Sequence, residues 1–104
     1  MTTFDDREKA FEDKYMHDQE LQFRVDVRRN RLLGLWAAEL LGKDNVEAYA
    51  EEVISTEFEE LGDADPVRKI LGDLQDGGIE MSEHRLRKKM EECLAEGKEQ
   101  VMKE

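Results

Sequence analysis

Residues 19–41 read QELQFRVDVRRNRLLGLWAAELL, and the architecture follows from this segment. Apolar residues recur along it at intervals of three and four, which is the spacing of one face of an α-helix. The residues of this face are Leu21, Val25, Leu32, Leu35 and Trp36. Toward its end the segment becomes apolar all round, through Leu33, Ala37, Leu40 and Leu41. A helix with apolar residues on every side is covered by several neighbours, so the segment predicts a central helix.

Three further helical patterns follow, at about residues 45–61, 66–75 and 83–102. The residues that can cap them are Asp44, Asp65 and Ser82. Glu47 completes a capping-box-like pair with Asp44, and Pro66 suits the first position of its helix. We therefore expect an all-α fold: a four-helix bundle at residues 19–104, preceded by a flexible, conditionally helical arm at residues 1–18.

Most glycines of the chain belong to one of two groups. Gly42, Gly62 and the pair Gly77–Gly78 follow helical patterns, where a left-handed residue commonly ends a helix. Gly34 and Gly97 instead lie within helical patterns, where glycine costs about 1 kcal/mol relative to alanine. A close approach between two helices would be one reason for glycine at these two positions.

Length and charge exclude several classes of protein. The chain has 104 residues, enough for one domain, and 27 acidic against 16 basic side chains give a net charge of −11. This charge argues against binding to nucleic acid. The single cysteine precludes an internal disulfide and favours a reducing compartment. Residues 32–41, the most apolar stretch, are too few to cross a bilayer, and the first residues are acidic where a secretory signal would be basic. We expect a cytoplasmic protein without direct membrane insertion.

The N-terminal residues 1–18 differ from the rest of the chain. Their apolar seam is thin and consists of Phe4, Phe11 and Tyr15. Burial of the three rings would contribute about 5–9 kcal/mol, whereas ordering the backbone costs about 1–2 kcal/mol per residue. The segment therefore favours an arm that is disordered alone and folds as a helix in the groove of a partner. The alternative is that it simply extends the first helix along the bundle.

The residues that could carry chemistry do not form a catalytic or metal-binding pattern. Cys93 lies on the apolar face of the last helix without a neighbouring base, so we expect a core thiol. His17 and His84 are far apart, and the sequence has no zinc-ligand spacing. We expect no metal, no cofactor and no enzymatic activity. Glu57 projects toward an apolar stripe, and we expect it to pair with an arginine of the first helix or to lie at a hydrated edge of the core.

Two basic clusters stand out against the acidic background. The first consists of Arg24, Arg28, Arg29 and Arg31. The second consists of Arg85, Arg87, Lys88 and Lys89, near a helix start where the dipole disfavours cations. These clusters are candidates for an anion or nucleotide site, or for docking to an acidic partner. Salt bridges to the abundant carboxylates are the simpler interpretation, and exposed pairs of this kind contribute little stability.

Two stretches resemble a known family. Residues 1–15, MTTFDDREKAFEDKY, and residues 28–38, RRNRLLGLWAA, are similar to the zeta subunit of alphaproteobacterial F-type ATP synthases, a family formerly known only as a domain of unknown function. The resemblance extends over essentially the whole chain, including FEELGD at residues 58–63.

The resemblance implies an intrinsic inhibitor of ATP hydrolysis. The inhibitory region of that family maps here to the arm, Thr2 to about Gln19, which would enter an α/β catalytic interface near the γ stalk and fold there as a helix. Rotation in the hydrolysis direction would be blocked, while the bundle anchors the arm. The expected partners are the α, β and γ subunits of the catalytic head, and the expected location is cytoplasmic, peripheral to the inner membrane through the synthase. The arm residues expected to contact the partner are Phe4, Asp5, Arg7, Phe11, Lys14 and Tyr15.

An alternative function does not need the arm. A small nucleotide- or anion-sensing helical regulatory protein would use the clusters Arg24–Arg31 and Arg85–Lys89. Weak nucleotide binding is compatible with inhibition, because nucleotide would then act as a regulator.

Overall fold

A computed structural model describes residues 18–57 and 65–104, and this part of the chain contains four helices. They are α2 (Gln19–Leu41), α3 (Val46–Thr56), α4 (Pro66–Asp76) and α5 (Glu83–Lys103). The all-α, four-helix prediction is confirmed. The expectations for the arm and for the remainder of the second helix, including Leu61 and Gly62, fall on residues 1–17 and 58–64, outside the described ranges.

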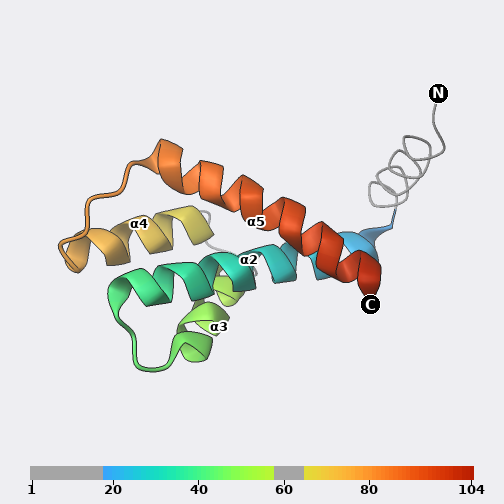
Figure 1. Cartoon of the computed structure of the whole chain (residues 1–104), viewed down its shortest axis with the longest axis horizontal. Coiled ribbons are helices and arrows are strands. Elements are labelled where there is room, and N and C mark those ends of the chain that lie inside the picture. Colours follow the sequence, from blue (N-terminus) through green and yellow to red (C-terminus); the bar gives the residue numbers. More distant parts are fainter. Residues whose placement is uncertain (1–17, 58–64) are drawn as a thin grey trace.

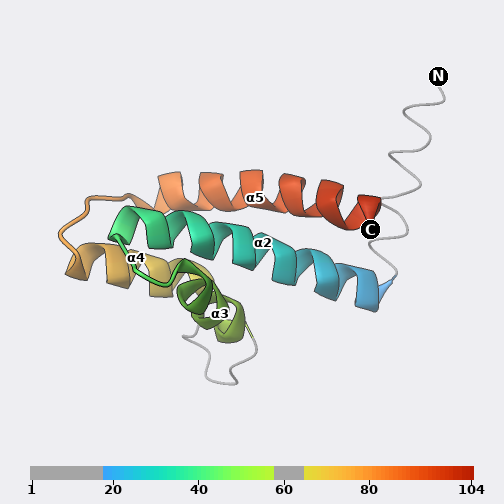
Figure 2. The same ribbon diagram turned by 60° about the horizontal axis from the view of Figure 1, so that its bottom comes forward.

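Helix α2 is the centre of the arrangement and contacts each of the other three helices (Figure 1). Helix α5 runs antiparallel along its length, and α3 packs on the other side of α2 (Figures 1 and 2). Helix α4 lies beside the second half of α2, where Gly77 approaches the Leu41 side chain. This arrangement explains why the second half of α2 is apolar on all sides, whereas its first half is covered mainly by α5.

The core is concentrated where the four helices meet. Its buried residues are Leu33, Ala37, Ala38, Tyr49, Val53, Val67, Ile70, Leu74, Leu86 and Cys93. A smaller cluster lies between the first half of α2 and the end of α5, where Val25 and Val101 are buried and Leu21 and Leu94 pack against them. In the described residues, no helix combines the length and apolar character needed to cross a membrane.

Short polar side chains cap the start of each described helix. Asp18, Asp65 and Ser82 accept hydrogen bonds from backbone N–H groups of α2, α4 and α5, respectively. The prediction that Asp44 caps the second helix is wrong, because Asn45 has an extended backbone and its Oδ1 accepts from the Ala48 N–H at 3.1 Å. Asparagine caps a helix about as well as aspartate, so composition alone does not distinguish adjacent candidates.

Left-handed glycines follow the ends of two helices, α2 and α4, as the sequence indicates. Gly42 follows α2 with φ of 69°, and its N–H and that of Lys43 bond to carbonyls of the last turn. In the pair after α4, Gly78 is the left-handed residue with φ of 75°, whereas Gly77 has φ of −84°.

The two glycines inside helices lie at close approaches. A Cβ added to Gly34 would be 2.7 Å from the Cα of Ala50 in α3. A Cβ added to Gly97 would be 3.3 Å from the backbone nitrogen of Arg29 in α2. Gly34 and Gly97 therefore let α3 and α5 approach α2 from its two sides, which confirms the reason expected for them.

Candidate functional site

The first basic cluster is paired with carboxylates of the same chain. Arg24 contacts Glu104 at 2.5 Å, and Arg28 bonds to both Glu104 and Gln100. Arg31 reaches Glu47 at 2.6 Å, and Arg29 reaches Glu57 at 2.5 Å. Because every guanidinium group of the cluster has an internal partner, the simpler salt-bridge interpretation fits residues 24–31 better than an anion site does.

Glu104 joins the end of α5 to the beginning of α2. Hydrogen bonds from Arg28 and Arg24 stabilise its carboxylate and hold its pKa below the ordinary value. The contact lies about two to three turns from Asp18, the cap of α2. It therefore reinforces the end of the bundle to which residues 1–17 are joined.

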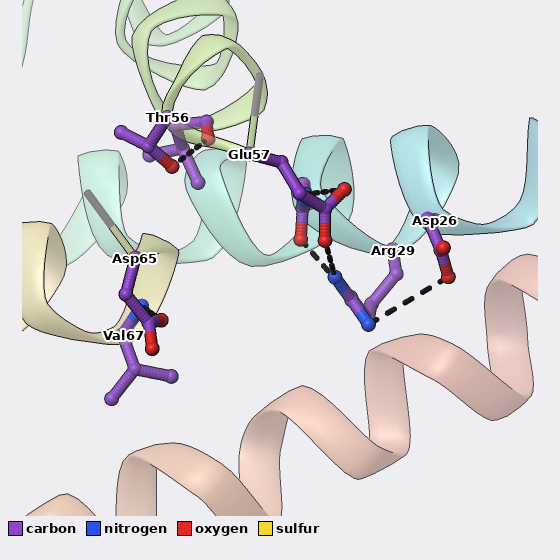
Figure 3. Close-up of polar contacts among 8 residues, drawn as sticks. Asp26, Arg29, Thr56, Glu57, Asp65 and Val67 are labelled. Carbon is purple, nitrogen blue, oxygen red and sulfur yellow. Dashed lines mark hydrogen bonds and ion pairs between the residues drawn. The ribbon is translucent and has the colours of Figure 1, made fainter. Parts of the chain in front are cut away.

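Glu57 contacts an arginine of the first helix, the kind of partner expected for it. Its Oε1 is 2.5 Å from Arg29 Nη2, and its Oε2 accepts from Asn30 Nδ2 at 2.9 Å (Figure 3). Arg29 also donates to Asn30 Oδ1 and lies 3.7 Å from Asp26. Asn30 is fully buried. The group thus joins α2 to Glu57, the residue that caps the end of α3, through a buried amide and a charge pair.

We expect the change Asn30→Ala to lower the free energy of unfolding by about 1–3 kcal/mol, because it removes a buried donor to Glu57 and leaves a cavity. Urea unfolding followed by circular dichroism measures this effect. Arg31→Ala is the matched control, since it removes only a half-exposed ion pair and is expected to change stability by at most about 1 kcal/mol. Equal effects of the two changes would contradict a structural role for the buried amide.

Tyr49 and Asp73 form a second polar contact that sequence reasoning missed. The Tyr49 hydroxyl donates to Asp73 Oδ2 at 2.7 Å, and Lys69 lies 3.2 Å from the same oxygen. Burial and the neighbouring Asp73 raise the pKa of Tyr49 far above its ordinary value. The phenol is therefore protonated and serves as a structural donor between α3 and α4.

The other candidates for chemistry are structural or isolated. Cys93 is buried in the core, which confirms the expected core thiol, and burial raises its pKa. Such a thiol is a poor nucleophile. His84 lies exposed in the first turn of α5. Within residues 18–57 and 65–104, the structure has no group of three potential metal ligands.

The second basic cluster lies in the first two turns of α5. Arg87 pairs with Glu83 at 3.2 Å. Lys89 lies 3.5 Å from Glu92 and 5.5 Å from the centre of the Trp36 ring. Because α2 and α5 are antiparallel, this cluster lies beside the second half of α2, whereas Arg24 and Arg28 lie beside the end of α5 (Figure 1). Arg29 and Arg87 line one hollow together with Met90, Glu91 and Leu94. Arg29 is already paired with Glu57 and Arg87 with Glu83, so this hollow does not combine free cations of the two clusters.

A family model described as ATPase inhibitor subunit zeta matches residues 1–100. The chain belongs to this family. No match is found among curated proteins. The match includes residues 1–17, helices α2 to α4 and α5 up to residue 100, so this part of the chain has the pattern of a zeta subunit.

Membership of the zeta family makes the chain an inhibitor subunit of an ATPase, with a regulatory role. The residues expected to contact the partner, Phe4, Asp5, Arg7, Phe11, Lys14 and Tyr15, lie outside the described ranges. What the structure describes of the zeta subunit is therefore its helical body.

Proposed function

We propose that this chain inhibits ATP hydrolysis by the catalytic head of an F-type ATP synthase. Residues 1–18 insert as a helix at an α/β catalytic interface near the γ stalk, and this blocks rotation in the hydrolysis direction while permitting synthesis. The observation that carries the proposal is the match of the zeta family to residues 1–100, because the match spans both the arm and the body.

The start of α2 supports the division between arm and body. Asp18 has an extended backbone, and its carboxylate accepts from the Leu21 N–H at 3.1 Å. A capped start favours a helix that begins at Gln19 over one that continues from the arm. This supports a division of the chain in which residues 1–18 form the arm and the body begins with α2 at Gln19.

The helical body serves as the tether of the arm. An arm with three aromatic anchors binds weakly by itself, and attachment to a docked body raises its local concentration at the interface. Phe4, Phe11 and Tyr15 enter apolar parts of the crevice, while Arg7 and Lys14 pair with acidic groups and Asp5 favours the positive end of the helix dipole. The protein then resides in the cytoplasm, held at the inner membrane through the synthase.

An ATPase assay tests the function. Addition of this protein to the isolated catalytic head of the cognate synthase is expected to suppress ATP hydrolysis at near-stoichiometric amounts. In membrane vesicles energised by a proton gradient, ATP synthesis by the intact synthase is expected to continue, which separates a directional block from general inactivation. Undiminished hydrolysis at a large excess of the protein would disprove the proposal.

A further inference from the structure

One face of α5 carries an incompletely neutralised positive patch. Arg85, Lys88 and Lys89, here called the α5 patch, recur at intervals of three and four and so share one face of the helix. Together with Trp36, Met81 and Glu92 they line a shallow hollow of about 290 Å³. Trp36 is half-buried, so part of its ring is available at this surface.

The α5 patch differs from the arginines of α2 in how its charges are compensated. In the part of the chain that the structure describes, the side chains of Arg85 and Lys88 have no ion pair or hydrogen bond, and both are exposed. Lys89 is held between Glu92 and the Trp36 ring. In a chain with a net charge of −11, two uncompensated cations beside an aromatic ring form a local site for negative charge.

The position of Arg85 does not serve the stability of α5. Ser82 caps this helix and accepts from the Arg85 N–H, so Arg85 is the third helical residue. Glutamate at this position would complete a capping box with the serine, whereas a cation opposes the helix dipole in the first turn. The arginine therefore stands where the fold itself favours an acid, which is expected of a residue retained for binding.

We propose that the α5 patch and Trp36 dock the body against an acidic surface of the ATPase that this chain inhibits. This inference rests on the proposed function and adds the surface by which the body is anchored. Charge complementarity selects the partner, and the partly exposed indole supplies the aromatic contact that interfaces favour. A partner helix or loop rich in Asp and Glu fits a hollow lined by three cations.

The geometry separates this contact from the arm. Trp36 lies about 26 Å along the axis of α2 from Gln19, at 1.5 Å per residue. The α5 patch is thus at the opposite end of α2 from the point where residues 1–17 join the body (Figure 1). Docking through the patch leaves that end free to present the arm, and simultaneous contact at two points raises the overall affinity.

The charge reversal Arg85→Glu tests the docking role. We expect the variant to need about tenfold more protein for half-inhibition of the isolated catalytic head, with a lower association rate that depends less on salt. Its melting temperature is expected to stay the same or rise, because the change creates the capping box. If Arg85 had only a structural role, the Arg85→Glu variant would instead have a lower melting temperature than the wild type.

Arg87→Glu is the matched control. It makes the same change in net charge on the same helix, but Arg87 is two residues from Arg85, outside the α5 patch, and pairs with Glu83. We expect half-inhibition to stay within about twofold of wild type, as for loss of an exposed pair. Equal losses from Arg85→Glu and Arg87→Glu would assign the effect to overall charge and overturn the proposal.

Two further measurements complete the test. Lys88 is exposed in the second turn of α5, and Lys88→Glu is expected to reproduce the loss of inhibition. If both Arg85→Glu and Lys88→Glu inhibit as well as the wild type, the docking proposal is overturned, while the proposed function stays intact. Sedimentation of the protein alone tests whether a second copy of this chain binds at the α5 patch. A dimer that dissociates on Arg85→Glu, with inhibition unchanged, would assign the patch to self-association instead. Absence of inhibition by the wild type would remove the proposed function itself.

Discussion

Replacement of Gly34 by alanine is expected to destabilise this protein by about 1–3 kcal/mol, the range for overpacking a well-packed core. In most helices the same change is stabilising, since alanine has the higher helix propensity. Here the added methyl group would lie 2.7 Å from the Cα of Ala50 and 3.3 Å from the Cβ of Val53. A backbone atom cannot move aside as the tip of a side chain can, so α2 and α3 must separate. Chemical denaturation followed by circular dichroism measures the loss.

Gly72→Ala is the matched control for this prediction. Gly72 lies within α4, and a Cβ at this position would have no neighbouring atom within 4 Å. The same substitution there is expected to stabilise the protein by about 0.5–1 kcal/mol. Stability changes of opposite sign for Gly34→Ala and Gly72→Ala would show that the contact between α2 and α3 determines the effect at Gly34. If Gly34→Ala also raised stability, the close packing of these helices would be refuted.

The helix boundaries could be predicted where the signals are local. The first helix was expected at Gln19 to Leu41, and α2 has these bounds. Its start depends on Asp18 and its end on Gly42, and both act on backbone groups within a few residues. The caps Asp65 and Ser82 were found for the same reason. Between the adjacent candidates Asp44 and Asn45, the choice depends on where the loop after Gly42 turns, which a capping preference does not determine.

The buried polar contacts could be predicted only in part. For Glu57, its place on an apolar stripe was enough to suggest an arginine partner, and Arg29 provides it. Asn30 and Tyr49 gave no such signal, since their partners Glu57 and Asp73 are 27 and 24 residues away in sequence. Residue type likewise does not show whether the cations of a basic cluster are paired with carboxylates of the same chain. Which cations are neutralised depends on the antiparallel packing that brings Glu104 to Arg24 and Arg28.

Removal of residues 2–17 is expected to abolish inhibition while leaving the body folded. The shortened chain keeps Asp18, so the cap of α2 is preserved, and the residues of both apolar clusters lie in α2 to α5 or in the loop between α4 and α5. Inhibition is measured on the isolated catalytic head, and helix content and melting temperature are measured on the protein alone. A melting temperature close to that of the full chain would show that the arm contributes little to the stability of the body.

A single substitution in the full-length chain tests the same physics more finely. Phe11→Ala removes one aromatic anchor, and loss of about 1.5–3 kcal/mol of burial at the interface corresponds to roughly tenfold to hundredfold weaker inhibition. Leu40→Ala is the control, because Leu40 is an exposed apolar residue at the far end of α2 and its truncation is expected to leave inhibition unchanged. Full inhibition by the shortened chain would refute the role of the arm. A helix anchored by its aromatic rings must bind more weakly when one of them is removed. Loss of inhibition in Leu40→Ala but not in Phe11→Ala would therefore assign the inhibitory contact to the body instead of the arm.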